Sequence, residues 1–216
     1  MVLPYGLRHR KDKERRAVLN VVLVEPEIPA NTGNIGRTCV LTGARLHLVG
    51  PLGFSLSDQA VRRAGLAYWE SLDVRTYPSW DAFVEANGRF GKALASPASD
   101  GSCVHLLTKR GARTYAESRY HDGDYLVFGK ESSGLDAELL GAHAGLCERI
   151  PMRGDDALDN AESWHEAHER LHPELERDIC GNFVDSRASQ ITSLNLSNAA
   201  AIVIYEALRQ TGFPGM

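Results

Sequence analysis

Residues 17–37 read AVLNVVLVEPEIPANTGNIGR, and the change of pattern within them decides the fold. Residues 17–24 are mostly β-branched or aliphatic, which predicts a buried strand, and the run ends at Glu25-Pro26. Residues 31–43 open on Asn-Thr-Gly-Asn and close on Gly43, which are start and stop signals of a helix. A buried strand followed by a helix is the first unit of a parallel α/β fold.

The same alternation continues along the chain. We expect further strands at 45–49, 74–77, 103–107, 125–128 and 147–150, and helices at 58–65, 79–86, 136–140 and 196–209. Strands separated by helices predict a mostly parallel sheet with helices on both faces.

The composition is that of an ordinary globular protein. Of 216 residues, 43% are hydrophobic and 24% are charged, which excludes a disordered chain. No apolar run approaches the length of a membrane span, and residues 1–20 lack the apolar core of a secretory signal. The four cysteines form no CxxC pair, which favours free thiols in a reducing compartment. We therefore expect a cytoplasmic protein that does not contact a membrane.

The formal net charge of −4 hides an uneven distribution of charge. Residues 1–20 sum to +4, whereas residues 154–188 sum to −7, which leaves −1 for the remainder. We expect a basic N-terminal arm at 1–18 and one domain at 19–215, with an acidic insertion at about 154–188. The overall charge alone would argue against a nucleic-acid partner, but the divided charge does not.

Three polar clusters lie next to the apolar segments, at 31–37 (NTGNIGR), 129–134 (GKESSG) and 193–198 (SLNLSN). We expect each cluster to follow an apolar strand, and in open parallel sheets ligands bind there, beyond the carboxyl ends of the strands. Each cluster also has a purely structural interpretation. The first would be a capped helix start with a surface arginine, and the second a polar turn in which Ser133 or Asp136 caps a helix. The third would be a helix cap as well.

Two other chemistries are poorly supported. Gly33 and Gly36 give only a GxxG fragment and not GxGxxG, so a dinucleotide-dependent oxidoreductase is not expected. His165, His168 and His172 lie along one predicted helical face in HEAHERLH, which is not HExxH. A solvated acidic helix is favoured there over a metal site, and we expect no metal.

The order NxGNxxR, FGxExxGL, IPM and SLNLSNA resembles the SPOUT superfamily of RNA methyltransferases. The stretches VEPEIPANTGNIGRTC and RRAGLAYWE are most similar to the family that methylates the 2′-hydroxyl of the tRNA wobble cytidine or uridine. The resemblance implies an α/β fold with a C-terminal deep trefoil knot, a homodimer, tRNA as substrate and S-adenosylmethionine as cofactor. Pattern reasoning alone would not propose a knot, because knots are rare.

The resemblance also implies roles for individual residues. The expected cofactor contacts are Leu107, Thr108, Gly129, Glu131, Ile150, Met152, Ser193, Leu194 and Asn198. The expected catalytic group is Arg37 with Asn34, Glu131 and Ser197, and the expected RNA contacts are Asn31, Arg37, Arg62 and Arg63. Arginine is a poor base at its normal pKa, so we interpret Arg37 as a positioning and electrostatic group.

The chain departs from this family pattern in two ways. Ser133 stands where some relatives carry an arginine, which puts any RNA contact of that arginine in doubt, and the basic arm and acidic insertion are additions to the family core. Two other functions remain open: 2′-O-methylation of another tRNA or rRNA nucleotide, and RNA binding without catalysis by a member of the same fold.

Overall fold

The computed structural model describes residues 18–55, 67–96, 103–152, 176–177, 183–184 and 193–216. The predicted basic arm, the predicted helix at 58–65, and Arg62 and Arg63 lie outside these ranges. Most of the acidic insertion, with its three histidines, also lies outside them.

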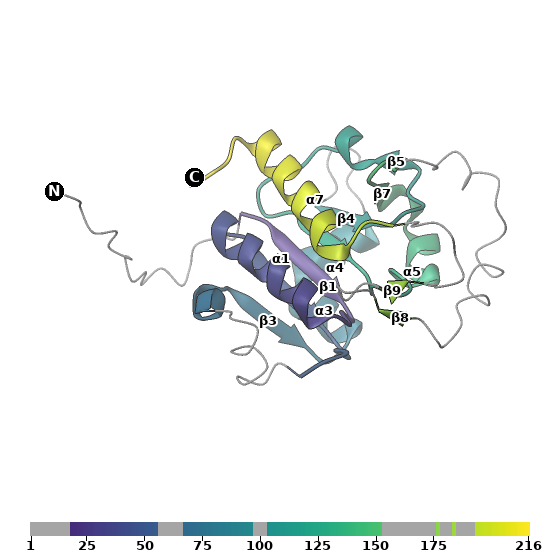
Figure 1. Ribbon diagram of the computed structural model, residues 1–216. Helices are drawn as coiled ribbons and strands as arrows, with labels where there is room; N and C mark the ends of the chain where they lie inside the picture. The colour runs from purple at the N-terminus through teal and green to yellow at the C-terminus, as the bar shows by residue number, and fades with distance from the viewer. Residues whose placement is uncertain (1–17, 56–66, 97–102, 153–175, 178–182, 185–192) are drawn as a thin grey trace.

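A sheet of seven parallel strands forms the centre of the molecule (Figure 1). Its order is β3-β2-β1-β6-β4-β7-β5. The strands are β1 (Asn20–Val24), β2 (Arg45–Val49), β3 (Val74–Tyr77), β4 (Val104–Leu107), β5 (Arg113–Thr114), β6 (Tyr125–Phe128) and β7 (Cys147–Arg149). The six predicted strands are confirmed; β2, β3 and β6 have the predicted bounds, whereas the ends of β1, β4 and β7 are shifted. The two-residue β5 is too short to give a sequence pattern. Inside the acidic insertion, β8 (Glu176–Arg177) and β9 (Phe183–Val184) pair antiparallel.

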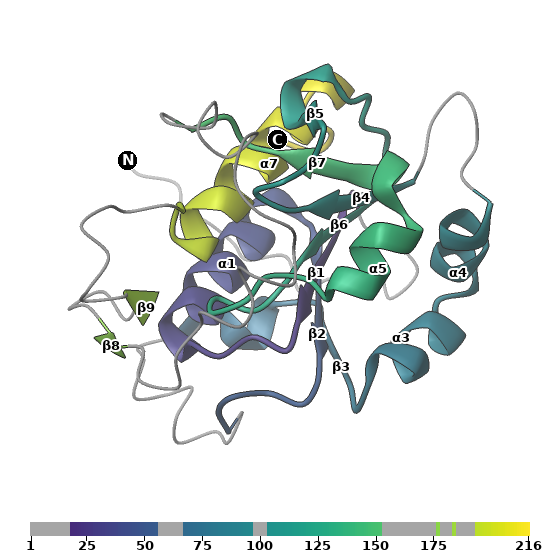
Figure 2. The ribbon, with the colours of Figure 1, turned by 90° about the vertical axis from the view of Figure 1, so that its right-hand side faces the viewer.

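Helices cover both faces of the sheet, as predicted (Figure 2). One face carries α1 (Pro29–Thr42) and α7 (Leu196–Thr211), which lie side by side. The other face carries α3 (Trp80–Ala86), α4 (Gly88–Ala95) and α5 (Ala137–Ala142). The prediction missed α4, because its segment GRFGKALA contains two glycines, the poorest helix formers after proline. The described ranges also contain short 3₁₀ helices: η1 (Ala67–Ser71), η2 (Tyr115–Glu117) and η3 (Ala144–Leu146).

The core consists of two apolar clusters, one on each face of the sheet. In β6, Leu126 and Phe128 pack towards α1 and α7, whereas Val127 packs towards the opposite layer of α3 and α4. There Phe83 and Phe90 lie fully buried, with ring centroids 4.8 Å apart. This alternation is the period-two pattern of a strand that is covered on both sides.

The start of α1 differs from the sequence prediction. The helix begins at Pro29 and not at residue 31, and its N-cap residue, Ile28, offers no side-chain hydrogen bond. Proline is favoured at the first helical position because its fixed φ suits the helix and its missing N–H is not needed there. Asn31 therefore lies inside the first turn, where it is 2% exposed.

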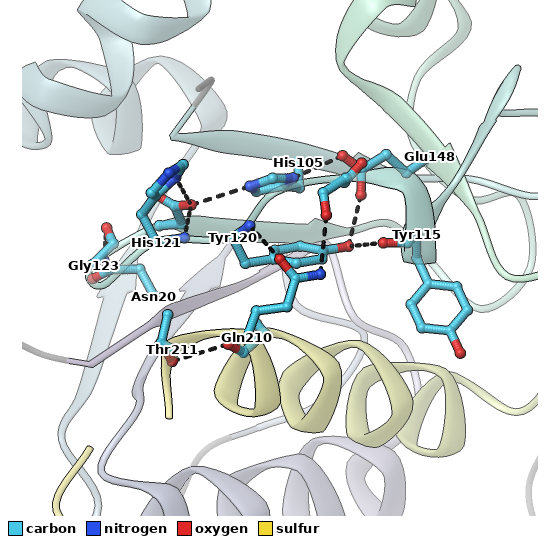
Figure 3. Close-up of polar contacts among 12 residues, drawn as sticks. Asn20, His105, Tyr115, Tyr120, His121, Gly123, Glu148, Gln210 and Thr211 are labelled. Carbon is cyan, nitrogen blue, oxygen red and sulfur yellow. Dashed lines mark hydrogen bonds and ion pairs between the residues drawn. The ribbon is translucent and has the colours of Figure 1, made fainter. Parts of the chain in front are cut away.

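A buried polar network crosses the sheet on the α7 face (Figure 3). His105 on β4 lies between two carboxylates: Nδ1 is 2.7 Å from Glu148 Oε1, and Nε2 is 3.3 Å from Asp124 Oδ2. The Tyr120 hydroxyl donates to Glu148 Oε2 at 2.8 Å. Because Glu148 is 0% exposed, its charge depends on these partners and on Arg113, whose guanidinium donates to it at 3.3 Å.

The network sets the charge of His105. Burial alone lowers the pKa of this imidazole, but the hydrogen bonds and charges of Asp124 and Glu148 outweigh burial, so the pKa of His105 is raised above its usual value. Burial likewise raises the pKa of Glu148, and its bonds with His105 outweigh that effect and lower it. Both shifts favour the charged forms, an imidazolium beside a carboxylate.

We expect His105→Gln to lower the free energy of unfolding more near pH 6 than near pH 9. A histidine whose pKa is higher in the folded than in the unfolded protein contributes its full stabilisation when the pH is below its unfolded-state pKa of about 6.5. This stabilisation is lost as the pH rises through the folded-state pKa. The variant leaves two buried carboxylates without the cation between them, which costs about 3 kcal/mol at the acidic end. Urea unfolding across this pH range measures the effect.

His47→Gln is the matched control, because His47 is also buried but its pKa is shifted in the opposite direction from that of His105. Burial, together with Arg45 and Arg75, lowers the pKa of His47 to about 3. Its stabilisation is present above about pH 6.5 and is lost as the pH falls, so the loss in this variant should be larger near pH 9. A pH-independent loss in His105→Gln would contradict a charged His105.

Candidate functional site

The loop after β6 holds the segment that leads into α1. The carboxylate of Glu131 accepts hydrogen bonds from the backbone N–H of Glu27 at 2.8 Å and of Ile28 at 3.3 Å. It also accepts one from Asn31 Nδ2 at 3.0 Å. A carboxylate beside the N-terminus of a helix is favoured by the helix dipole, so Glu131 supplies from a distant loop what Ile28 lacks.

The same two loops exchange hydrogen bonds in the other direction. The Glu27 carboxylate accepts from the backbone N–H and from the hydroxyl of Ser132, both at 3.0 Å. Lys130 Nζ lies 2.7 Å from Glu25 Oε2. We call this set the strand-end clamp; its members are Glu25, Glu27, Asn31, Lys130, Glu131 and Ser132. The clamp fixes the first predicted polar cluster against the second.

The third cluster joins the clamp through Asn31. Asn195 Nδ2 donates to Asn31 Oδ1 at 2.9 Å, so the Asn31 amide donates to Glu131 and accepts from Asn195. Asn195 is also the N-cap of α7: its Oδ1 accepts from the N–H of Ser197 at 2.8 Å and of Asn198 at 3.4 Å. Three clusters far apart in the sequence therefore meet in one hydrogen-bonded chain.

Four of the predicted cofactor contacts, Leu107, Thr108, Gly129 and Ile150, lie at the carboxyl ends of neighbouring strands. β6, β4 and β7 are neighbours, and Leu107 pairs with Phe128 on one side and Glu148 on the other. Gly129 and Ile150 follow directly after these partner strands, so the three strand exits lie side by side. Leu107, Thr108, Ile150 and Met152 are partly exposed, and Leu194 is 41% exposed. This edge therefore offers accessible apolar side chains and strand-end backbone. Ser193 and Asn198, which lie close to Leu194 in the sequence, are exposed.

Gly129 is required by the turn that carries Glu131. A Cβ at Gly129 would lie 2.0 Å from the carbonyl carbon of Gly134, because the loop doubles back on itself. Lys130 and Gly134 exchange both backbone hydrogen bonds, at 3.1 and 2.9 Å, and Gly134 has a φ of +76°. No side chain fits this approach, so the glycines set the direction in which Glu131 points.

Arg37 lies on the exposed side of α1, one turn after Asn34. Its guanidinium carbon lies 5.2 Å from the centre of the Tyr68 ring. Among the described residues, Arg37 forms no ion pair. Tyr68 lies in the stretch RRAGLAYWE but is not among the predicted site residues, and only the structure shows this contact.

Some predicted site residues have structural partners of their own. The Ser197 hydroxyl donates to Asn195 Oδ1 at 2.6 Å, which is a capping contact. Asp136 caps α5 by accepting from the N–H of Glu138 and Leu139, as the structural alternative proposed. The catalytic roles of Asn34 and Ser197 stay predictions, and Arg62 and Arg63 lie outside the described ranges.

In the part of the chain that the structure describes, no group of three or more histidine, cysteine, aspartate or glutamate residues is arranged to hold a metal ion. In the same part, none of the helices has both the length and the apolar character that a membrane span requires.

Comparison with known proteins adds a family to this geometry. Residues 18–158 match the model of the SpoU rRNA Methylase family. The tRNA (cytidine(34)-2′-O)-methyltransferase of Escherichia coli K12 is 39% identical over 199 residues, which cover 92% of this chain and 97% of that protein. The enzyme of the same name from Burkholderia cenocepacia is also 39% identical, over 92% of this chain and 99% of its own.

Solved structures agree. A structure concerned with the 2-OH methylation of C/U34 on tRNA is 34% identical, covers 91% of this chain and 97% of its own, and superposes with a TM-score of 0.62. The AdoMet-bound rRNA methyltransferase from Sinorhizobium meliloti is 23% identical and covers 90% of this chain and 57% of its own, with a TM-score of 0.58. At that identity the second structure supports the fold alone.

We expect Glu131→Gln to lower the free energy of unfolding by about 1–2 kcal/mol, because the clamp loses its charge and one of its acceptor oxygens. Urea unfolding measures the loss. Glu85→Gln, at an exposed position of α3, is the control and should change stability by less than about 0.5 kcal/mol. Equal stability of the Glu131 variant and the wild type would contradict the clamp.

Proposed function

Because the chain belongs to the SpoU methylase family, we propose that it methylates the ribose 2′-hydroxyl of the wobble pyrimidine, position 34 of tRNA, with S-adenosylmethionine as methyl donor. The observation that carries this proposal is the hydrogen-bonded chain Glu131–Asn31–Asn195, which assembles all three polar clusters beside three neighbouring strand ends. Relatives of 37–40% identity over most of the chain carry that activity in their names.

The residues at the sheet edge fit S-adenosylmethionine. Leu107, Ile150 and Met152 present partly exposed apolar side chains for a flat heterocycle, and the strand-end backbone at Thr108 and Gly129 offers polar groups. When bound, S-adenosylmethionine supplies an electrophilic methyl group on a positively charged sulfur. Methyl transfer to a hydroxyl needs alignment of the attacking oxygen more than it needs a metal.

Arg37 aligns the substrate in this proposal. Its guanidinium carries five N–H donors in a planar fork, which suits a phosphate or a ribose oxygen of the RNA. A fixed positive charge beside the 2′-hydroxyl favours the oxygen as it loses its proton, while water or the neighbouring phosphate takes the proton. The clamp determines where α1 begins, and so determines where Arg37 lies along the helix.

A homodimer is supported by the outward face of the α1 and α7 layer. Leu41 on α1 is 69% exposed, and Ile202 and Tyr205 on α7 are 36% and 46% exposed. Ile202 and Tyr205 are three residues apart on one helix face, with Asn198 one turn before them, so a partner seated there would border the site. Exposed apolar side chains on adjacent helices are typical of an interface between subunits.

The trefoil knot and the cytoplasmic location are also part of the proposal. In support of the knot, β7 lies between β4 and β5, and residues 108–112 connect those two strands over it. A Cβ at Gly111 would lie 2.5 Å from the carbonyl carbon of Glu148, and Arg149 Nη1 donates to the Gly111 carbonyl at 2.7 Å. The cytoplasmic location is supported by tRNA as the proposed substrate.

The decisive experiment combines wild-type protein, total tRNA and labelled S-adenosylmethionine, with the product mapped by 2′-O-methyl-sensitive sequencing. We expect label at the wobble pyrimidine and a loss of about 100-fold in Arg37→Ala, because one charged donor leaves the reacting oxygen. Cofactor affinity, measured by calorimetry, should stay unchanged in that variant. Lys92→Ala on α4, on the opposite face of the sheet, is the control and should retain full activity.

Any other result of this methylation experiment would favour a different function or a different role for Arg37. Label in another tRNA position or in rRNA would retain the chemistry and change the substrate. Binding of RNA without any binding of S-adenosylmethionine would favour a non-catalytic protein. A loss of cofactor affinity in Arg37→Ala, equal to its loss of activity, would contradict the role given to Arg37.

We expect Tyr205→Glu to convert a dimer into a monomer, because it places a charge at the centre of the exposed apolar face of α7. Light scattering during gel filtration measures the mass. Lys92→Glu on α4 is the control and should leave the dimer intact. A wild-type protein with the mass of one chain would contradict the proposed dimer.

A further inference from the structure

We propose that Tyr68 is a positioning residue for Arg37: its ring supports the guanidinium that meets the RNA. This role rests on the proposed methyl transfer and adds a residue to it. Tyr68 lies on η1, which follows β2 in the chain, whereas Arg37 lies on α1. The two side chains therefore meet only because η1 packs against α1.

The contact has the geometry of a cation–π interaction. The guanidinium carbon of Arg37 is 5.2 Å from the ring centroid of Tyr68, within the range of about 6 Å in which a cation is attracted by an aromatic face. Arg37 is exposed, and no carboxylate of the described residues pairs with it. Within the described ranges, the Tyr68 ring is therefore a contact that restricts where this long side chain points.

Tyr68 is itself held in place by α1. Its hydroxyl donates to the carbonyl of Gly33, one turn before Arg37. Burial raises the pKa of the phenol, and the charge of Arg37 opposes this only partly, so the hydroxyl stays protonated and remains a donor. The ring is anchored at its oxygen and offers its face to the guanidinium.

Gly36 allows η1 to come this close to α1. A Cβ at Gly36 would lie 3.1 Å from Leu72 Cδ2 and 3.3 Å from Trp69 Cζ3, tighter than ordinary van der Waals contact. Trp69 and Leu72 both pack into the core on the α1 face. The position of Tyr68 is therefore set by the packed residues that follow it in the chain, Trp69 and Leu72.

An aromatic support has a chemical advantage over an ion pair at this point. A carboxylate would accept N–H groups of the guanidinium and neutralise its charge, whereas a ring face attracts the cation and leaves its in-plane donors free. Arg37 thus keeps its hydrogen-bonding capacity for an anionic substrate while its freedom to rotate is reduced.

The test compares Tyr68→Phe, which keeps the ring, with Tyr68→Leu, which removes it. We expect Tyr68→Leu to lower kcat for tRNA methylation by about tenfold, with little change in KM or in S-adenosylmethionine affinity. Tyr68→Phe should stay within about threefold of wild type. Ser71→Ala, exposed on the same 3₁₀ helix, is the matched control and should have wild-type activity.

Two further measurements separate positioning from a general structural effect. The double variant Arg37→Ala/Tyr68→Leu should be no slower than Arg37→Ala, because a residue that acts through Arg37 has nothing to add once Arg37 is gone. The NMR signal of the Arg37 Nε–H group should lose its ring-current shift in Tyr68→Leu and keep it in Tyr68→Phe, and this readout needs no activity.

The outcomes are distinguishable. An inactive wild type would overturn the proposed function and the role of Tyr68 with it. An active wild type with a fully active Tyr68→Leu variant, or with a Tyr68→Phe variant as slow as Tyr68→Leu, would overturn the role of Tyr68 alone. A double variant slower than Arg37→Ala by the full factor of Tyr68→Leu would also overturn it, since the two residues would then act independently.

Discussion

The amide of Asn31 is the group on which the candidate site depends. It donates to Glu131 at 3.0 Å and accepts from Asn195 at 2.9 Å, and its side chain is almost completely buried. A buried amide with both ends satisfied is stable in one orientation only, because reversing it would face donor to donor and oxygen to carboxylate. The loops after β1 and β6 and the start of α7 therefore take a single arrangement.

This arrangement explains why the clusters contain more polar side chains than the capping of α1 and α7 requires. Glu131 serves α1 in place of a cap from Ile28, and Asn195 caps α7 while it also reaches Asn31. The structural and functional readings of the clusters are thus not alternatives. The capping contacts place the helices, and the helices place Arg37 and the strand-end residues beside each other.

Much of the fold followed from local patterns in the sequence, because each central strand is a short apolar run ended by glycine, proline or a polar residue. The two-residue β5 and the glycine-containing α4 gave no such pattern, and the first turn of α1 was misplaced because Asn31 looks like a cap. The site residues came largely from the family resemblance, whereas pairings such as Glu131 with Glu27, or Arg37 with Tyr68, join residues with no local relation. Sequence periodicity carries no information on contacts of that range.

The separation of Asn31 and Asn195 has a consequence for synthesis of the protein. These two residues are 164 positions apart, so a nascent chain that has emerged only as far as β7 has its sheet strands but no partner for the Asn31 oxygen. Contacts of such sequence separation form late, because closing a long loop costs entropy before any contact compensates for it. Residue 195 must therefore leave the ribosome before this edge of the sheet is complete, which keeps a shorter nascent chain from presenting a finished site.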